Sequence, residues 1–256
     1  MKTSDDALNV LEETEAPEEA ASLTSDEEEK MKAMMEAGVF YGYTKPRTHP
    51  KNKPYIISTR AGVQVIDLVK TMECLKEAAL MIKDAVKSGG LMLLVGTTPS
   101  VKSAVKATAE RLGLPHVTER WLGGTLTNFK TISGRINYFK KLKEDKASGG
   151  LDKYTKKERV LLDEKLAKLD KFFSGVETLD RLPSLVLIVD LKAHEIAARE
   201  AKRMGIPVVG FLNTNADPDL ADCPVPVNTR SAKSVEFLMS YLSQEVERAR
   251  SDVQNN

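Results

Sequence analysis

The chain has 256 residues, of which 41% are hydrophobic, and a formal net charge of +1 at pH 7. That length predicts one large domain, or one domain with a substantial insertion, and it is sufficient to bury a good core. No apolar run approaches the roughly 20 residues that span a membrane, and the first residues lack the pattern of a secretory signal, so a membrane-spanning or secreted protein is not expected. The spacing of Cys74 and Cys223 fits neither a metal site nor a redox motif, and it predicts reduced thiols in the cytoplasm.

The small net charge averages two regions of opposite sign. Residues 1–29 hold eleven acidic residues and one lysine, a charge of −10, whereas residues 30–256 hold 37 basic and 26 acidic residues, a charge of +11. The first region is poor in aromatic and β-branched residues, so we expect a disordered acidic extension over residues 1–29. The basic remainder favours a polyanionic partner, most often a nucleic acid, over a surface that is charged only for solubility.

After the acidic extension, the sequence predicts a short helix, a proline-rich loop, two strands and a longer helix. The short helix is expected at residues 31–37, ended by Gly38. In the loop at residues 43–60, three prolines disfavour a helix and favour an extended, stiff backbone that carries basic side chains. YIIST and VQVID are expected as strands, and residues 71–86 as an amphipathic helix.

Apolar runs and helical segments then alternate along the chain. A continuous apolar run such as LMLLVG is typical of a parallel strand that is buried on both faces. The alternation predicts an α/β fold with an open, mostly parallel sheet and helices on both faces, formed by a discontinuous domain of residues 30–130 and 174–250. The expected strands are residues 91–96, 184–190, 206–212 and 224–228, and the expected helices are residues 100–112, 193–204 and 231–250.

Residues 131–173 interrupt this alternation with a lysine-rich segment of helical pattern. Ile132, Ile136 and Phe139 are spaced by four and three, and a second apolar series is spaced by four, three and four. Two such series around a glycine-containing turn predict an antiparallel helical hairpin that is inserted into the α/β domain and protrudes from it. The second series is Leu162, Leu166, Leu169 and Phe173. Residues 251–256 are expected to form a disordered tail.

Three segments bear on whether the protein is an enzyme. HEIAA has an alanine where a zinc-binding H-E-x-x-H helix needs its second histidine, so His194 and Glu195 are expected to be surface or helix-capping groups. Residues 95–104 follow a strand and open a helix, which suits a phosphate, but they lack the glycine-rich phosphate motifs, and an ordinary turn is the simpler interpretation. NTNADPD (213–219) fits a metal site and a turn equally well. We expect no catalytic residue, no bound metal and no cofactor.

Two basic segments predict RNA binding. The first is the proline-rich loop, whose preordered bases would lose little entropy on binding phosphates. The second is RWLGGTLTNFK (120–130), which offers charges, hydrogen-bonding side chains and glycines that allow close approach. Its tryptophan, the only one in the chain, is expected to anchor the turn onto the sheet rather than to stack on a base. The expected RNA-binding residues are Lys45, Arg47, Lys51, Lys53, Arg60, Arg120, Trp121, Thr125, Asn128, Lys130 and Arg135.

HPKNKPYIISTRAGVQVIDLVKT, RWLGGTLTNFKT and VDLKAHEIAAREAKRMGIPVVGFLNTNADPD occur in this order in one chain. Together they closely resemble the bacterial family of universal small-subunit ribosomal protein two, and the resemblance covers residues 31–248. It implies a Rossmann-like (flavodoxin-like) sheet with a protruding helical hairpin. It also implies a non-catalytic component of the 30S subunit that binds 16S ribosomal RNA and neighbouring ribosomal proteins in translation, and that helps to recruit the OB-repeat ribosomal protein one.

The sequence departs from the family pattern at two places. The family's H-F-G-H is FYGY at residues 40–43, which argues against a histidine-dependent contact or metal site there. Thr98 stands where the family has a basic residue, which weakens an RNA contact by that turn. A small-molecule α/β enzyme of phosphosugar-isomerase type stays open as the alternative function. It would bind phosphate with residues 95–104 and use Asp217 or Glu195 as a base.

Overall fold

The computed structural model describes residues 25–151 and 154–254. Residues 1–33 and residues 34–256 form two compact units. All described strands belong to the second unit, and so do the two basic segments that the sequence singles out.

Helix α2 (Ser25–Glu36) is the first described element. The sequence predicts disorder over residues 1–29; residues 1–24 lie outside the described part of the chain, whereas residues 25–29 are helical. Acidic residues suit the positively polarised start of a helix, which explains why α2 begins earlier than its apolar pattern indicates. The helix ends as expected, with Gly38 just beyond it in the left-handed conformation at φ 70°.

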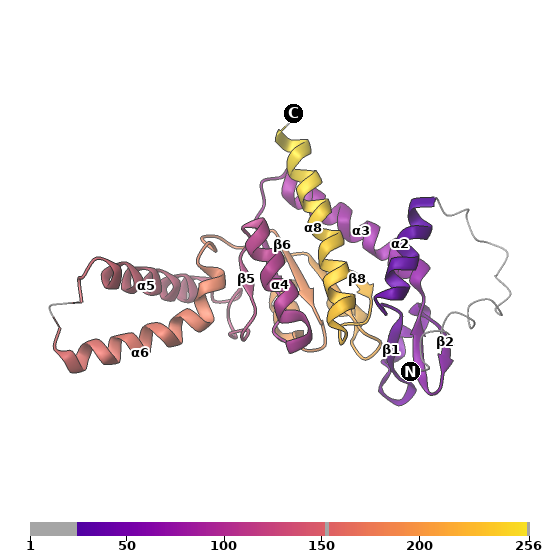
Figure 1. Cartoon of the computed structure of the whole chain (residues 1–256), viewed down its shortest axis with the longest axis horizontal. Helices are drawn as coiled ribbons and strands as arrows, with labels where there is room; N and C mark the ends of the chain where they lie inside the picture. Colours follow the sequence, from indigo (N-terminus) through magenta and orange to yellow (C-terminus); the bar gives the residue numbers. More distant parts are fainter. Residues whose placement is uncertain (1–24, 152–153, 255–256) are drawn as a thin grey trace. The chain divides into compact units, whose positions relative to one another are not determined.

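A five-stranded parallel sheet forms the centre of the second unit (Figure 1). The strands are β4 (Met92–Val95), β5 (His116–Val117), β6 (Leu185–Val189), β7 (Val208–Leu212) and β8 (Cys223–Pro226). Their order is β5-β4-β6-β7-β8 and every pairing is parallel, which is the order of flavodoxin-like folds. The expected open α/β sheet is therefore confirmed. Only β5 is absent from the sequence prediction, because two residues are too short to give an apolar run.

Helices cover both faces of this sheet, because successive strand residues point to opposite sides. The helices next to it are α3 (Leu68–Lys87), α4 (Pro99–Leu112), α7 (Glu195–Arg203) and α8 (Ala232–Gln254). Leu94 and Leu187 pack in one core with residues of α3, α4 and α8. Their neighbours Leu93 and Ile188 pack in a second core with residues of α7.

The segment between the two halves of the sheet forms two antiparallel helices, α5 (Phe129–Ala147) and α6 (Lys156–Phe173), which lie side by side (Figure 1). Phe139 of α5 is fully buried, whereas Leu166 of α6 is half-buried, so the predicted apolar seam exists but is only partly closed. The first turn of α6 is fixed by a capping box, in which the Thr155 hydroxyl accepts from the Glu158 N–H and the Glu158 carboxylate accepts from the Thr155 N–H.

A second sheet of three antiparallel strands comes first in the chain, in the order β1-β3-β2. It consists of β1 (Tyr41–Thr44), β2 (Ile56–Arg60) and β3 (Val63–Ile66). Strands β2 and β3 match the sequence prediction, whereas β1 is too short and irregular in pattern to be recognised. The loop between β1 and β2 corrects the expectation of an extended backbone, since it contains two 3-10 helices, η1 (Lys45–Arg47) and η2 (Pro50–Tyr55). A proline occupies the first turn of each, where a missing N–H costs no hydrogen bond, so the prolines begin these helices instead of preventing them.

Helix α8 continues to Gln254, whereas the sequence predicts a disordered tail over residues 251–256; residues 255–256 lie outside the described part. The extra turn has a contact of its own, because Asp252 forms an ion pair with Lys83 of α3 at 3.0 Å. Within the described part of the chain, no helix combines the length and the apolar character needed to cross a membrane.

Candidate nucleic-acid interface

A buried carboxylate, Glu200 of α7, holds the RWLGGTLT turn in place. Its Oε1 accepts hydrogen bonds from the indole N–H of Trp121 at 3.1 Å and from the backbone N–H of Gly124 at 2.8 Å. Its Oε2 accepts from the backbone N–H groups of Leu126 and Thr127 at 3.0 and 3.3 Å, and from the Thr127 hydroxyl at 3.3 Å. Gly124 adopts φ 88°, a conformation that favours glycine. The turn is therefore wrapped around one side chain.

These donors keep Glu200 ionised although its residue is only 8% exposed. Burial alone would raise the pKa of Glu200, but the hydrogen bonds from the turn outweigh it and lower the pKa below its ordinary value. Sequence reasoning missed this residue. The signal was its place among Ala197, Ala198 and Ala201 on the buried face of α7, where a carboxylate needs a partner.

The turn exposes some of the predicted contact residues and buries others. Arg120 and Asn128 are exposed, while Trp121 is half-buried against the core beneath the turn, as expected of an anchor. Thr125 is only 5% exposed, and its hydroxyl donates to the Leu122 carbonyl at 2.6 Å. We therefore leave Thr125 out of the candidate interface and treat Trp121 as its support.

A set of cations continues from the turn into helix α5. Arg120, Lys130 and Arg135 are exposed, and no carboxylate in the described part of the chain forms an ion pair with any of them. Glu119, next to Arg120, is engaged by Lys102 instead. We call Arg120, Asn128, Lys130 and Arg135 the turn group.

A second set of cations lies at one end of the three-stranded sheet. Lys45 directly follows β1 and Arg60 ends β2, and the register of both strands brings them beside Val63, the first residue of β3. The backbone N–H of Lys45 donates to the Gly62 carbonyl at 3.1 Å, which fixes it at the β2–β3 turn. Arg47 follows in the same 3-10 turn, and all three basic side chains are exposed. We call Lys45, Arg47 and Arg60 the tip group.

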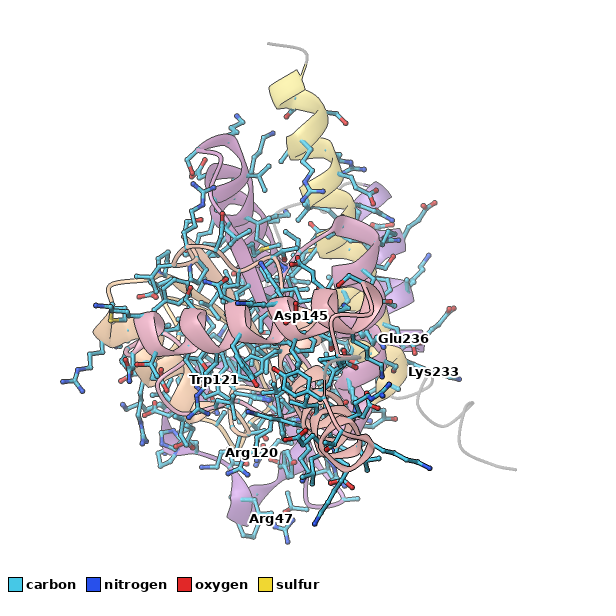
Figure 2. All side chains as sticks on the ribbon, turned by 90° about the vertical axis from the view of Figure 1, so that its left-hand side faces the viewer. Arg47, Arg120, Trp121, Asp145, Lys233 and Glu236 are labelled. Atoms are coloured by element: carbon cyan, nitrogen blue, oxygen red, sulfur yellow. The ribbon has the colours of Figure 1, made fainter. Side chains whose placement is uncertain are left out.

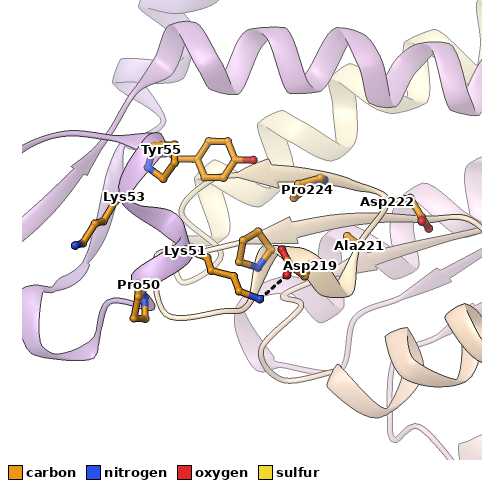
Figure 3. A pocket seen from close by; sticks show the side chains of 10 residues that line it. Pro50, Lys51, Lys53, Tyr55, Asp219, Ala221, Asp222 and Pro224 are labelled. Atoms are coloured by element: carbon orange, nitrogen blue, oxygen red, sulfur yellow. Dashed lines mark hydrogen bonds and ion pairs between the residues drawn. The ribbon is translucent and has the colours of Figure 1, made fainter.

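Lys51 and Lys53 lie apart from the tip group, on a pocket of about 640 Å³ between η2 and η4 (Pro218–Leu220) (Figure 3). Lys51 forms an ion pair with Asp219 and a longer one with Asp217 at 3.5 Å. The hydrogen bond to Asp219 raises the pKa of Lys51, and the same bond lowers the pKa of Asp219. The charge of Lys51 is thus balanced within the protein, whereas Lys53 has no ion pair in the described part of the chain.

The NTNADPD loop (213–219) follows β7 and accepts hydrogen bonds from residues of β1 and η2 and from His49 between them. We call this loop the NTNADPD socket. The Thr214 carbonyl accepts from the His49 N–H and from Asn52 Nδ2, both at 2.8 Å, and the Thr214 hydroxyl accepts from the Tyr43 N–H at 2.8 Å. Asn52 Nδ2 also donates to the Ala216 carbonyl at 2.7 Å. The carboxyl ends of parallel strands are where α/β folds commonly bind ligands. At the carboxyl end of β7, this position is occupied by the protein's own segment of β1 and η2.

His194 is 3% exposed, which corrects the expectation of a surface group. It does occupy the N-cap position of α7, but its side chain makes no capping hydrogen bond. Its Nδ1 donates to the Asp190 carbonyl at 2.8 Å, and its Nε2 accepts from the Thr97 N–H at 3.0 Å. Burial lowers the pKa of His194, in keeping with a neutral ring in this arrangement. The ring ties the chain after β4 to the chain after β6. Sequence reasoning missed this role.

Seven of the predicted contact residues therefore form two groups along the carboxyl edge of the parallel sheet, whereas Lys51 and Lys53 stand apart on the pocket. The turn group follows β5, one outer strand, and the tip group is joined through the NTNADPD socket to the end of β7, next to the other outer strand, β8. Figure 2 places Arg47 and Arg120 toward the same side of the second unit. The two groups suit an extended polyanion that follows the edge better than a small ligand bound at one point.

The sequence of this chain is similar to those of known ribosomal proteins. The sequence profile described as ribosomal protein S2 matches residues 34–249. The small ribosomal subunit protein uS2 of Coprothermobacter proteolyticus is 41% identical over 216 residues, which cover 84% of this chain and 81% of that protein. The proteins of the same name from Roseiflexus sp. and Geotalea uraniireducens are 40% and 41% identical over 213 residues, 83% of this chain and 81% and 83% of theirs. Since the matched residues include the parallel sheet, the paired helices and both basic groups, the chain belongs to the ribosomal protein S2 family.

Proposed function

We propose that this protein is a structural constituent of the small ribosomal subunit, and that it binds 16S ribosomal RNA through the turn group and the tip group. Membership of the ribosomal protein S2 family supports the place in the subunit, and hence in the cytoplasm, where ribosomes translate. The charge distribution supports the RNA contact, because residues 30–256 carry a net charge of +11.

The observation that carries the proposal is a set of exposed cations that stand on a fixed backbone without carboxylate partners in the described part of the chain. Arg120 and Lys130 extend from a turn held by the Glu200 carboxylate, and Lys45 and Arg47 extend from a loop held by the NTNADPD socket. Cations that the protein leaves unpaired are available for RNA phosphates, and their fixed backbone lowers the entropy lost on binding.

We also propose contacts with neighbouring proteins of the subunit. Residues 131–173 would serve as an arm inserted into the α/β domain of residues 30–130 and 174–250. Exposed apolar side chains on α6 support protein contacts there, because Val160 and Leu161 are 52% and 56% exposed. The resemblance of the three long segments supports the OB-repeat ribosomal protein one as a further neighbour.

The alternative, a phosphosugar isomerase, finds less support in the same region. The Thr97 N–H, a donor that a phosphate site at residues 95–104 would use, is taken by the buried ring of His194. Glu195 is engaged in ion pairs with basic residues of its own segment, and Asp217 accepts hydrogen bonds from its own loop and from η2. Both candidate bases therefore already have ion-pair or hydrogen-bond partners within the protein.

Sedimentation distinguishes the two functions. The full-length protein is mixed with small-subunit particles that lack it, and the particles are pelleted through sucrose. We expect stoichiometric protein in the pellet and no change in melting temperature on addition of phosphosugars. Protein that stays in the supernatant, or that is stabilised by a phosphosugar, would overturn the proposal.

A further inference from the structure

Strand β1 carries an aromatic surface that the hydrophobic cores and the basic groups do not use. Tyr41 is 47% exposed and Tyr43 is half-buried, although both lie in a strand that is tied to the interior. From their arrangement we infer that Tyr41, Tyr43 and Arg230 form a stacking platform for an unpaired nucleotide of RNA. This inference rests on the proposed function and adds the kind of RNA element that the protein holds.

Gly42, between the two tyrosines, lies in close contact with the protein interior. A Cβ atom on Gly42 would lie 2.8 Å from Thr214 Cγ2 and 2.9 Å from the Gln64 carbonyl oxygen, so this position faces the protein interior at close contact. The register of β1 against β3 shifts between Tyr41 and Thr44, so regular alternation does not set the side-chain directions here. Tyr41 and Tyr43 flank this inward-facing position, and both side chains keep exposed surface.

One side of each member of the platform is supported by the protein. The Tyr41 ring lies against the Phe40 ring, with centroids 4.2 Å apart and planes at 34°. The Arg230 guanidinium lies over the Tyr43 ring, 5.3 Å from its centroid, within the range of a cation–π contact. The backbone of Arg230 is held in turn, because its N–H donates to Asn228 Oδ1 at 3.1 Å. Arg230 itself is exposed.

The chemistry of this surface fits an unpaired base better than a duplex. RNA-binding proteins stack unpaired bases on aromatic rings and on guanidinium planes, and both are present here. The phosphates beside such a base need cations, and Lys45 of the tip group lies two residues beyond Tyr43. A duplex keeps its bases stacked inside the helix and would leave the rings unused. The FYGY stretch thus has an expected use that does not require the histidines of the family pattern.

Chemical probing of reconstituted small-subunit particles tests the inference. Particles are assembled with the wild type, Tyr41→Leu, Tyr41→Phe or Arg230→Lys, and the 2′-hydroxyl groups of the RNA are acylated to report nucleotide mobility. Tyr41→Leu keeps an apolar side chain but loses the ring face, whereas Tyr41→Phe keeps the ring. Arg230→Lys keeps the charge but loses the planar guanidinium.

We expect Tyr41→Leu to raise acylation about fivefold or more at one or a few unpaired nucleotides, Arg230→Lys to raise it at the same nucleotides, and Tyr41→Phe to match the wild type. Identical profiles for Tyr41→Leu and the wild type would overturn the platform while leaving the proposed function intact. Loss of a neighbouring protein with an unchanged RNA profile would assign the surface to a peptide and also overturn it. Failure of the wild type itself to enter the particles would contradict the proposed function instead.

Discussion

At the scale of single residues, two buried polar side chains shape the carboxyl edge of the parallel sheet. Glu200 gathers the N–H groups of the RWLGGTLT turn, and His194 joins the chain segments after β4 and β6. His194 begins the HEIAA stretch that fails to match a zinc-binding motif, and Glu200 follows in the same helix. A charged residue on an otherwise apolar helix face was a sufficient signal for Glu200, whereas Thr97, which donates to His194, is 97 positions away and could not be predicted as its partner.

Replacing Glu200 with glutamine should destabilise the turn. The amide NH₂ would face N–H donors where the carboxylate has an acceptor, so buried donors lose their partners at a cost of about 1–3 kcal/mol. Glu195→Gln on the same helix is the matched control and should cost less than about 1 kcal/mol, because its ion pairs lie at the surface. Urea unfolding followed by the fluorescence of Trp121 measures both, and equal unfolding free energies for the two variants would refute the role of Glu200.

The same carboxylate should give the turn a defined pH dependence. The pKa of Glu200 is lowered in the folded protein, so its stabilising contribution is fully present above the ordinary glutamate pKa of about 4.3 and is lost as pH falls through the folded value below it. The difference in unfolding free energy between the wild type and Glu200→Gln should therefore be constant from about pH 7 to pH 5 and shrink below about pH 4. A difference that already shrinks between pH 7 and pH 5 would contradict the lowered pKa.

At the scale of elements, long and periodic segments follow their sequence patterns, and short segments follow their tertiary contacts. The buried strands, helices α3, α4 and α8 and the paired helices α5 and α6 are all predicted by apolar spacing. Strands β1 and β5 are not, because four residues and two residues give no recognisable pattern. The loop from Lys45 to Tyr55 shows a further difficulty, since prolines that break an α-helix can begin a 3-10 helix.

Removing a half-buried leucine from the seam between α5 and α6 should lower the free energy of unfolding moderately. Leu166→Ala removes apolar contacts with the core shared with α5, and we expect a cost of about 1–2 kcal/mol, below the roughly 2–5 kcal/mol of a fully buried leucine. Leu161→Ala, on the same helix but 56% exposed, should change the free energy of unfolding by less than about 0.5 kcal/mol. Thermal unfolding of both variants by circular dichroism decides, and a Leu166→Ala protein as stable as Leu161→Ala would mean that the seam does not hold the helices together.

At the scale of the whole molecule, the sequence predicts the chemical class of the partner but not the positions of the contact residues in the fold. Composition and the two basic segments indicate a polyanionic partner, and the eleven predicted contact residues all lie in the second unit. The sequence could not show that seven of them divide into two groups, because the strand order that separates β5 from β8 is a property of the folded sheet. It also could not show that Lys51 is neutralised by Asp219, which lies 168 positions away.

This division predicts unequal contributions to RNA affinity. Arg47→Ala combined with Lys45→Ala should weaken binding to 16S ribosomal RNA and flatten the plot of log K against log salt concentration by about 0.7–0.9 for each lost phosphate contact. Lys51→Ala should change the slope much less, because its charge is already balanced by two carboxylates. A Lys51→Ala slope as low as that of the double variant would show that this lysine contacts phosphate after all.

The central claim, that exposed cations along the carboxyl edge contact RNA in the subunit, is tested most directly by lysine modification of the unaltered protein. Free protein and assembled small-subunit particles are treated with an acetylating reagent, and the modified lysines are quantified by mass spectrometry. Lys45 and Lys130 should lose reactivity in the particle, whereas Lys87 should keep it. Lys87 is an exposed residue at the end of α3, which precedes β4, so it lies toward the opposite edge of the sheet. Equal reactivity of Lys45 and Lys130 in the free and assembled states would contradict the account.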